Sequence, residues 1–348
     1  MHCRQKKHII TARTILFMIV LCFSLSAKSQ TDKERKNFFW RTIEWVDRNF
    51  VRQDTVYVFP NRYNLFVRPR YTYKEEFYHF TSKNEHQEIT LNTRPNNKIG
   101  LYFGWRGLAV GYNVNLNDHN PEIDFDLGLY TSGLGLELLL NKRTEGFHIK
   151  SIDGVEENIQ RGRNEKYFNG INITQGSARL FYVFNYKRFS YPSAYAHKRP
   201  QRISAGSFVI GATYHQRMFD FDYTKLDYNV QRELGDKFKF DQMKYMNINI
   251  NTGYSYNWVF AKNFVANISF IPAVGYKVND NSKRFIQNIN CDIQARMAVV
   301  YNNGLYFAGA DFLSHTHFYN NNNIDIIQGV NRFRLYVGYN FWRKKQNR

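Results

Sequence analysis

Hydrophobic and polar side chains alternate with a period of two along residues 245–260. One face of this stretch is apolar or aromatic at nearly every position: Met246, Ile248, Ile250, Thr252, Tyr254, Tyr256, Trp258 and Phe260. The other face is small, polar and uncharged: Asn247, Asn249, Asn251, Gly253, Ser255 and Asn257. A period of two is typical of a strand and fits no helix. The stretch is much longer than the ~5–6 residues usual in globular sheets, whereas ~9–11 tilted residues already cross a bilayer. We therefore predict a transmembrane β-strand here.

The same period continues through most of the chain from residue 63 onward, which predicts about twelve strands. They are expected at residues 64–77, 87–105, 108–116, 125–131, 134–142, 172–186, 203–218, 245–260, 264–276, 289–301, 305–316 and 330–341. Residues 87–105 are counted as one strand that is kinked at Pro95-Asn96-Asn97. The even number is typical of bacterial outer-membrane barrels.

The connections between these strands are of two kinds that alternate along the chain. Tight turns are expected at Arg106-Gly107, Ser132-Gly133, Lys262-Asn263 and Asn303-Gly304. Long loops are expected at residues 81–86, 118–122, 143–171, 221–242, 279–285 and 317–328. Short periplasmic turns and long extracellular loops give a membrane barrel this asymmetry. Residues 187–202 break the rule, because they fall on the short-turn side yet are long, basic and aromatic; they are either a long turn or a segment that folds under or into the barrel.

Alternation alone does not distinguish a membrane barrel from a soluble one. An apolar interior twelve strands around would be largely empty, which is costly, whereas apolar side chains that face lipid leave no void. The predicted fold is therefore all-β: a transmembrane antiparallel β-barrel of about 12 strands with a short N-terminal amphipathic helix. A secreted β-sandwich is the structural alternative.

The first residues predict export. A charged start, an apolar run at residues 15–23 and Ala27-Lys28-Ser29 match a signal peptide over residues 1–29. A periplasmic segment over residues 30–62 follows, with a helix at 32–52 that either packs on the barrel or acts as a cap or plug. The barrel is expected over residues 63–342 and a basic tail over 343–348. Of three cysteines only Cys291 remains after cleavage, so no intramolecular disulfide can form.

The charge balance bears on partners. The formal net charge is +19, and loss of five cations with the signal leaves +14. The expected surroundings are outer-membrane lipid and lipopolysaccharide, whose phosphates a basic surface attracts. Nucleic acid is not expected, because the charge is spread along strands and loops. The last strand, with its aromatic end near Phe341, is similar to the sorting signal that barrel-assembly machinery reads during insertion.

Two stretches carry a family resemblance. Residues 188–195, RFSYPSAY, and residues 201–207, QRISAGS, resemble the signature of an exported family from Bacteroidota known only as a domain of unknown function. The segment Arg188–Ser207 thus marks the chain as similar to that family from about Asp54 to the C-terminus. The resemblance implies an outer-membrane barrel and supplies no catalytic residues.

The inward polar positions are the main candidates for function. The following residues are expected to line the lumen: Arg68, Arg70, Lys74, Glu76, Glu137, Arg179, Asp292, Arg296, Arg332 and Arg334. They would form either a salt-bridged plug or the lining of an anion-favouring pore. The function expected is thus a passive channel or a structural barrel with a basic lumen; a non-channel binding or assembly partner at the cell surface is an alternative.

A second cluster suggests chemistry. Asp311, Ser314, His315 and His317 lie close in sequence near a predicted strand end, where a hydrolase dyad or a metal is conceivable. A lipid-modifying barrel enzyme is therefore a further alternative. The sequence contains no nucleophile elbow, zinc spacing or paired-carboxylate signature, so no cofactor, metal or catalytic residue is expected.

Overall fold

The computed structural model describes residues 53–60, 62–82, 86–105, 107–116, 123–143, 147–154, 166–196, 199–226, 228–233, 242–278, 288–320 and 324–344. They all belong to one compact unit that begins at Phe50. The predicted signal peptide, the predicted helix at 32–52 and the last four residues of the tail lie outside the described residues. No helix in the described part of the chain is long and apolar enough to cross a membrane.

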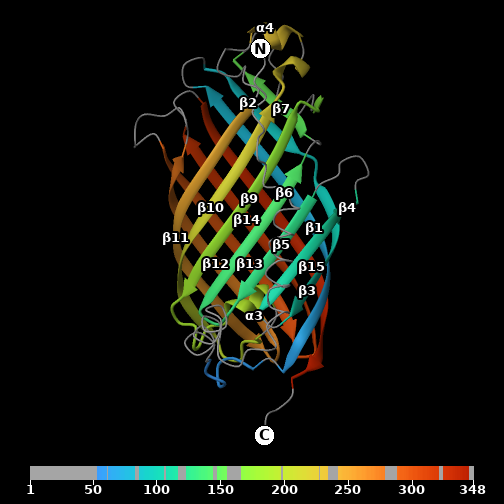
Figure 1. Cartoon of the computed structure of the whole chain (residues 1–348), viewed down its shortest axis with the longest axis vertical. Helices are drawn as coiled ribbons and strands as arrows, with labels where there is room; N and C mark the ends of the chain where they lie inside the picture. The colour runs from blue at the N-terminus through green and yellow to red at the C-terminus, as the bar shows by residue number, and fades with distance from the viewer. Residues whose placement is uncertain are drawn as a thin grey trace, which may run out of the picture. The chain divides into compact units, whose positions relative to one another are not determined.

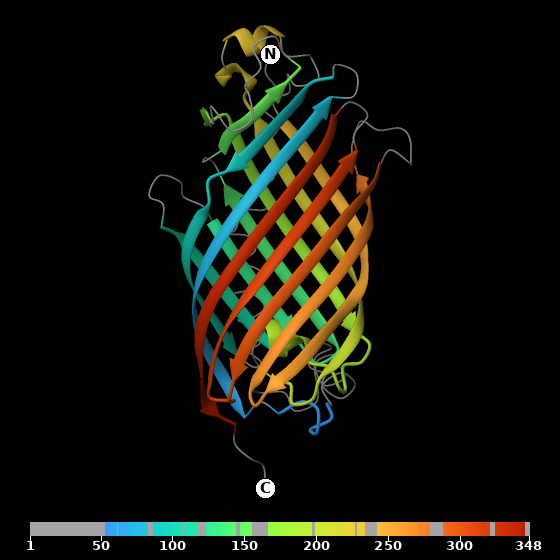
Figure 2. The ribbon, with the colours of Figure 1, turned by 180° about the vertical axis from the view of Figure 1, so that it is seen from behind.

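Twelve antiparallel strands close into a barrel (Figures 1 and 2). In order around the wall they are β1 (Tyr63–Ser82), β3 (Asn96–Trp105), β4 (Leu108–Asn115), β5 (Ile123–Tyr130), β6 (Leu134–Arg143), β9 (Ile171–Val183), β10 (Ala205–Phe221), β11 (Gln242–Ala261), β12 (Phe264–Val278), β13 (Ile289–Asn302), β14 (Tyr306–Asn320) and β15 (Ile324–Arg343). The last strand pairs with the first, from Tyr63 opposite Arg343 to Ser82 opposite Ile324. The predicted fold class and strand number are confirmed.

The predicted kink in residues 87–105 is also present. β2 (Glu88–Thr93) and β3 follow one another along β1, with Asn92 opposite Phe77 and Asn96 opposite Lys74. The break falls at Arg94-Pro95, where proline cannot donate a ladder hydrogen bond. Beyond the break the strand changes its other neighbour, because β3 pairs with β4 whereas β2 pairs with β7.

The prediction that residues 143–171 form only a loop is wrong. They contain β7 (Phe147–Asp153) and β8 (Lys166–Phe168), which extend the sheet from β2 beyond the barrel (upper end of Figure 1). The reason is tertiary: β2 offers a free edge, and Phe147, Ile149 and Ile152 become fully buried there. Residues 221–242 similarly contain a 3₁₀ turn, η1 (Tyr223–Lys225), and helix α4 (Tyr228–Glu233).

The apolar faces of the strands point outward. On β11, Ile248, Ile250 and Trp258 are 55%, 65% and 58% exposed, whereas Asn247 and Asn249 are buried. The same alternation runs along the other barrel strands, including Phe333, Leu335, Val337 and Tyr339 of β15. A soluble sandwich would bury these side chains between two sheets, so that alternative is wrong. An apolar outer band with a polar interior is the arrangement of a barrel that crosses a membrane.

The two ends of the barrel differ as the sequence predicts. The tight connections between neighbouring strands all lie at the lower end in Figure 1. They are at Gly107, Ser132-Gly133, Lys262-Asn263 and Asn303-Gly304. Asn263 and Gly304 have φ of 67° and 93°, the left-handed conformation that such hairpin turns require. We call this the turn end, and the opposite end, which carries the long connections, the loop end.

The long connection at the turn end sends its central residues, 189–196, into the barrel. Their centre is the short helix α3 (Tyr191–Tyr195), all five residues of which are buried. Figure 1 shows α3 within the lower end of the barrel wall. Of the two alternatives for this segment, the structure has the one in which it enters the lumen.

Inside the barrel a charged layer lies between two apolar layers. Along β1 the inward side chains run from Phe66 through Arg68–Glu76 to Tyr78 and Phe80. β10 runs in the same way from Val209 through His215 and Arg217 to Phe219 and Phe221. The apolar layer at the loop end is one cluster that also includes residues of β2, β7, β8 and α4. The layer at the turn end is built by α3 and the barrel strands around it.

Candidate functional site

The charged layer surrounds a cavity of about 180 Å³, which we call the chamber. Seven basic side chains line it: Arg68, Lys74, Arg179, Arg217, Arg296, Arg332 and Arg334. Four acidic side chains line it: Asp124, Asp126, Glu137 and Asp292. With neutral histidines, the lining described here has three positive charges in excess.

The structure places all ten predicted lumen residues on the inward face of the barrel. Six are buried: Arg68, Arg70, Lys74, Glu76, Arg179 and Asp292. Glu137, Arg296, Arg332 and Arg334 are half-buried and line the chamber. Arg70 and Glu76 lie behind the lining, together with Lys98 and Asp311, and the charges of these four cancel one another.

Most of these charges form ion pairs that join different strands. Arg70 donates both terminal nitrogens to Asp126, at 2.8 and 2.7 Å, and its Nε to Asn113 at 2.8 Å. Lys98 Nζ lies 2.8 Å from Asp124, and Arg334 Nε lies 2.9 and 3.0 Å from the two oxygens of Asp311. Lys74 pairs with Glu76 along β1 at 2.5 Å. Such pairing is what allows charges to be buried at all.

One carboxylate serves two cations. Glu137 lies 3.4 Å from both Arg179 and Arg296, and it accepts a hydrogen bond from the Tyr130 hydroxyl at 2.9 Å. The two guanidinium groups therefore share a single negative charge, and this part of the chamber keeps a net positive charge.

Three lining cations have no carboxylate partner among the described residues. Arg68 donates to the Tyr195 carbonyl at 3.2 Å and lies over the Tyr102 ring at 4.1 Å. Arg217 bonds to the neutral side chains of Tyr319, Gln328 and His317. Arg332 makes no hydrogen bond or ion pair within the described ranges, and its Nε is buried. With one surplus cation at Glu137 and the negative charge of Asp292, whose ion-pair partners are neutral histidines, these three residues give the excess of three positive charges.

The predicted cluster of Asp311, Ser314, His315 and His317 is not assembled. Asp311 is six residues from His317 along β14, about 20 Å at ~3.3 Å per residue, and pairs with Arg334 instead. Ser314 has the parity of Phe312 and Phe318, which point outward, so it faces away from both histidines. Asp311, His315 and His317 share the inward face of β14, as expected from the strand period, but no Ser–His dyad forms at these positions.

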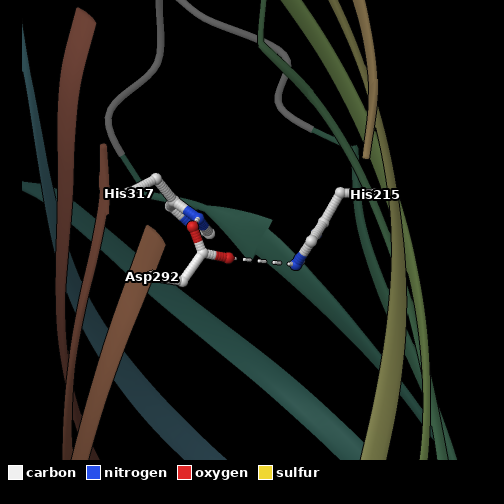
Figure 3. Close-up of side chains that lie close together, drawn as sticks. All are labelled: His215, Asp292 and His317. Atoms are coloured by element: carbon white, nitrogen blue, oxygen red, sulfur yellow. Dashed lines mark ion pairs between the residues drawn. The ribbon is translucent and has the colours of Figure 1, made fainter. Parts of the chain in front are cut away.

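His315 and His317 join a different group, with His215 and Asp292. Figure 3 shows His215, Asp292 and His317 of this group. His317 Nδ1 lies 2.9 Å from one oxygen of Asp292, and the Nε2 atoms of His215 and His315 lie 4.0 and 3.9 Å from the other. Asn249 also donates to Asp292 at 2.5 Å. The nearest ligand atoms of His215, Asp292 and His317 all lie within 4.8 Å of one another, close enough to consider a metal ion.

The hydrogen bond from Arg217 to His317 distinguishes a metal centre from a hydrogen-bonded group. Arg217 Nη2 lies 2.8 Å from His317 Nε2, and because a guanidinium only donates, this nitrogen must accept. A neutral His317 then carries its proton on Nδ1, the nitrogen that faces Asp292, and a protonated nitrogen cannot bind a metal. His215 and Asp292 alone are fewer than the three or four protein ligands of zinc sites. The arrangement therefore favours a buried polar network that holds Asp292 in place.

The same chamber residues hold α3. Arg68 bonds to the Tyr195 carbonyl, and Arg296 Nη1 donates to the Tyr191 hydroxyl at 2.9 Å. On the opposite side Asn257 donates to the Ser190 carbonyl at 3.0 Å. The Tyr195 hydroxyl bonds to Asn267, and burial raises the pKa of this hydroxyl, so it stays protonated as a donor. The segment is thus fixed in the lumen by polar contacts from several strands.

Sequence reasoning missed several chamber residues. These are Asp124, Asp126, His215 and Arg217 in the lining and Lys98 behind it. The signal was available for most of them, because each has the inward parity of its strand: Lys98 precedes outward Ile99, and Asp126 follows Phe125. Which of them pair across the barrel depends on register and could not be read from local spacing.

Comparison with known proteins identifies a matching family. The profile of a family described as "Domain of unknown function (DUF4421)" matches residues 52–341. No curated protein sequence matches the chain. Among solved structures, the translocator domain of autotransporter NalP from Neisseria meningitidis is similar, with 10% identity, a TM-score of 0.38, and coverage of 94% of this chain and 98% of that one.

Two other solved structures show the same level of similarity. The beta domain of the Bordetella autotransporter BrkA has 11% identity and a TM-score of 0.36, covering 80% of this chain and 100% of that one. OmpT of Vibrio cholerae has 8% identity and a TM-score of 0.28, covering 84% and 100%. Similarities with TM-scores this low carry no argument, so the function is argued from the chamber itself.

Proposed function

Because the chain belongs to the DUF4421 family, whose description assigns no role, we propose its function from the geometry of its lumen. The protein is an outer-membrane barrel that is closed to passive diffusion and holds a small anion in its chamber. This proposal combines the two alternatives for the inward residues, a salt-bridged plug and an anion-favouring lining. Most of the charges are paired as in a plug, and the positive charges without a partner favour an anion.

The two apolar layers support closure. At the loop end, Phe80 and Phe219 lie 5.3 Å apart and Tyr245 and Tyr319 lie 5.7 Å apart, measured between ring centroids. All four rings are inward and buried. At the turn end, α3 occupies the lumen, and Tyr191 packs on Phe181 at 4.8 Å. An ion that crossed the barrel would have to displace side chains in both layers.

The excess charge supports anion binding and is the observation that carries the proposal. Burial of an uncompensated charge costs several kcal/mol even after relaxation. The chamber lining described here has three such charges in excess, and the apolar layers separate it from bulk water. An anion held in the chamber would offset part of this excess, and guanidinium groups are good donors to oxyanions.

The outer surface of the barrel and the sequence support a location in the outer membrane. A barrel with an apolar band, tight turns at one end and long connections at the other is suited to the outer membrane of a Gram-negative cell. Export through a cleaved signal at residues 1–29, insertion by barrel-assembly machinery, and contact with lipopolysaccharide at the loop end belong to this proposal. A source among the Bacteroidota also belongs to this proposal, and the resemblance of Arg188–Ser207 to a family from that group supports it.

Planar-bilayer recording of purified protein tests the proposal. We expect no steady conductance from the wild type. A variant with Tyr191→Ala and Tyr195→Ala removes only the layer at the turn end. It should also show no steady conductance, because the layer at the loop end still blocks the lumen. Adding Phe80→Ala and Phe219→Ala opens both ends, and the reversal potential in a KCl gradient should then show anion preference.

Each recording has a result that contradicts the proposal. Steady conductance of the wild type would disprove closure, and this holds whether or not the variants fold. Cation preference of the doubly opened barrel would disprove the anion-favouring chamber. The heat-induced mobility shift of folded barrels in gel electrophoresis shows which variants have assembled.

A further inference from the structure

The barrel closes where β1 meets β15, and the inward side of this junction is strongly basic. We call this junction the seam; Figure 2 shows it as the blue strand beside the dark red one. Its inward side chains include Arg68, Arg70 and Lys74 of β1 and Arg332 and Arg334 of β15. The two strands contribute a single inward carboxylate, Glu76. The seam therefore holds five positive charges against one negative charge of its own.

Partners from other strands compensate only part of this charge. Arg70 pairs with Asp126 of β5, and Arg334 pairs with Asp311 of β14. Lys74 pairs with Glu76. Arg68 has no carboxylate, and Arg332 has neither a hydrogen bond nor an ion pair among the described residues. Two positive charges at the seam are left without a counter-charge.

The register places like charges directly opposite each other. Lys74 of β1 is the Cα partner of Arg332 of β15, and both line the chamber. Like charges at directly opposed positions destabilise a strand pair, and here the pair is the one that closes the barrel. A negative group between them would convert this repulsion into a bridge.

We propose that the chamber binds a small multivalent oxyanion, of the phosphate or sulfate type, at the seam between Lys74 and Arg332. Arg334, at the next inward position of β15 after Arg332, lines the same cavity. An oxyanion suits these residues better than a halide, because guanidinium forks match its paired oxygens. At ~30 Å³ per water, a cavity of about 180 Å³ holds about six waters. It therefore fits a small oxyanion with part of its hydration and excludes a whole lipid.

This inference rests on the anion-binding part of the proposed function and adds the place, the ligand class and the consequence. A ligand that touches β1 and β15 holds the first and last strands of the barrel together. It binds the closed barrel and not the unfolded chain, so it should raise the unfolding temperature.

Thermal unfolding of the full-length protein in detergent tests the site. Circular dichroism is followed with increasing phosphate, sulfate or chloride at constant ionic strength, and with glycerol phosphate to represent a lipid headgroup. We expect phosphate and sulfate to raise the unfolding temperature in a saturable manner. At a concentration a hundredfold above the dissociation constant the rise should be about 5 °C. If glycerol phosphate also raises the unfolding temperature, a lipid headgroup can supply the ligand. If it does not, the ligand is the free anion.

Two variants separate the site from general effects. Arg332→Gln should abolish the ligand-dependent rise, whereas Arg343→Gln, at the exposed end of the same strand, should keep it. Without ligand, Arg332→Gln should unfold at a temperature equal to or above the wild type, because a repulsion is removed and no bond is lost. Arg332→Lys retains the charge and should keep a weaker rise.

The inference is overturned if chloride gives the same rise as phosphate, or if Arg332→Gln keeps the full phosphate effect. These outcomes do not depend on conductance. A closed barrel without an oxyanion effect would disprove the seam site alone, whereas a conducting wild type that still shows the effect would disprove closure alone.

Discussion

The Arg70–Asp126 pair allows the cost of a lost charge in the chamber to be measured. Two hydrogen bonds of 2.8 and 2.7 Å join the side chains, which are 1% and 20% exposed. Asp126→Asn keeps the shape of the side chain but removes its charge. Arg70 would then keep its bond to Asn113 and one bond to the new amide oxygen, while the amide nitrogen would face its other terminal nitrogen, and the excess of positive charge in the lining would rise from three to four.

Removing one partner of a buried ion pair typically costs ~3–5 kcal/mol, and the low exposure of Arg70 supports this range here. The expected loss is therefore about 3 kcal/mol in the free energy of unfolding. Urea titration of the barrel in detergent, followed by tryptophan fluorescence, measures it. The double variant Arg70→Met with Asp126→Leu removes both charges and should recover most of the loss.

Two results would refute this reasoning. A cost below ~1 kcal/mol for Asp126→Asn is the value of an exposed pair and would mean that water reaches the chamber freely. A double variant no more stable than Asp126→Asn would mean that the packing of the pair, and not its charge, is what matters. Asp153→Asn is the control, since Asp153 is the last residue of β7 and lies outside the barrel wall and the chamber lining.

Three further predictions concern the other parts of the barrel. Ile250→Arg, which puts a cation on the outward face of β11, should cost ~2–4 kcal/mol near the bilayer midplane, measured by urea titration in lipid vesicles; no cost would contradict a lipid-facing surface. Gly104→Val should destabilise the turn end by ~1–3 kcal/mol, because a Cβ at Gly104 would lie 1.9 Å from the Phe66 ring, and the companion Phe66→Leu should relieve it. Purified protein dialysed against zinc should retain well below one equivalent by elemental analysis; a full equivalent that is lost in His215→Ala would show that His215, Asp292 and His317 do form a metal centre.

The alternation of side chains made the barrel predictable from sequence. In lipid every backbone group must be paired, so long strands closed into a barrel are the only all-β solution, and their two faces must differ. β11 illustrates this, since its asparagines and its isoleucines each stay on one side for the whole strand. The turn end was predictable for the same reason, because short hairpins require Gly or Asn at fixed places.

Structure built by tertiary contacts could not be predicted in this way. β7 pairs with β2 only because β2 turns away from β4 at Pro95. The position of α3 depends on contacts from Arg68, Asn257 and Arg296, which are far from it in sequence. In the chamber the inward residues were foreseeable by parity, but the partners were not: Arg70 and Asp126 are 56 residues apart, and His215 and Asp292 meet from strands that are not neighbours.

The pairing of Tyr63 with Arg343 has a consequence for biogenesis. A cylinder whose two free edges lie at opposite ends of the polypeptide cannot be completed during synthesis, and its final ladder joins segments of maximal sequence separation, a slow step by loop-closure entropy. Until then both edges expose unpaired amides and a row of mutually repelling cations. Solutes that neutralise those cations would therefore influence how fast the barrel closes after synthesis, as well as how stable the closed barrel is.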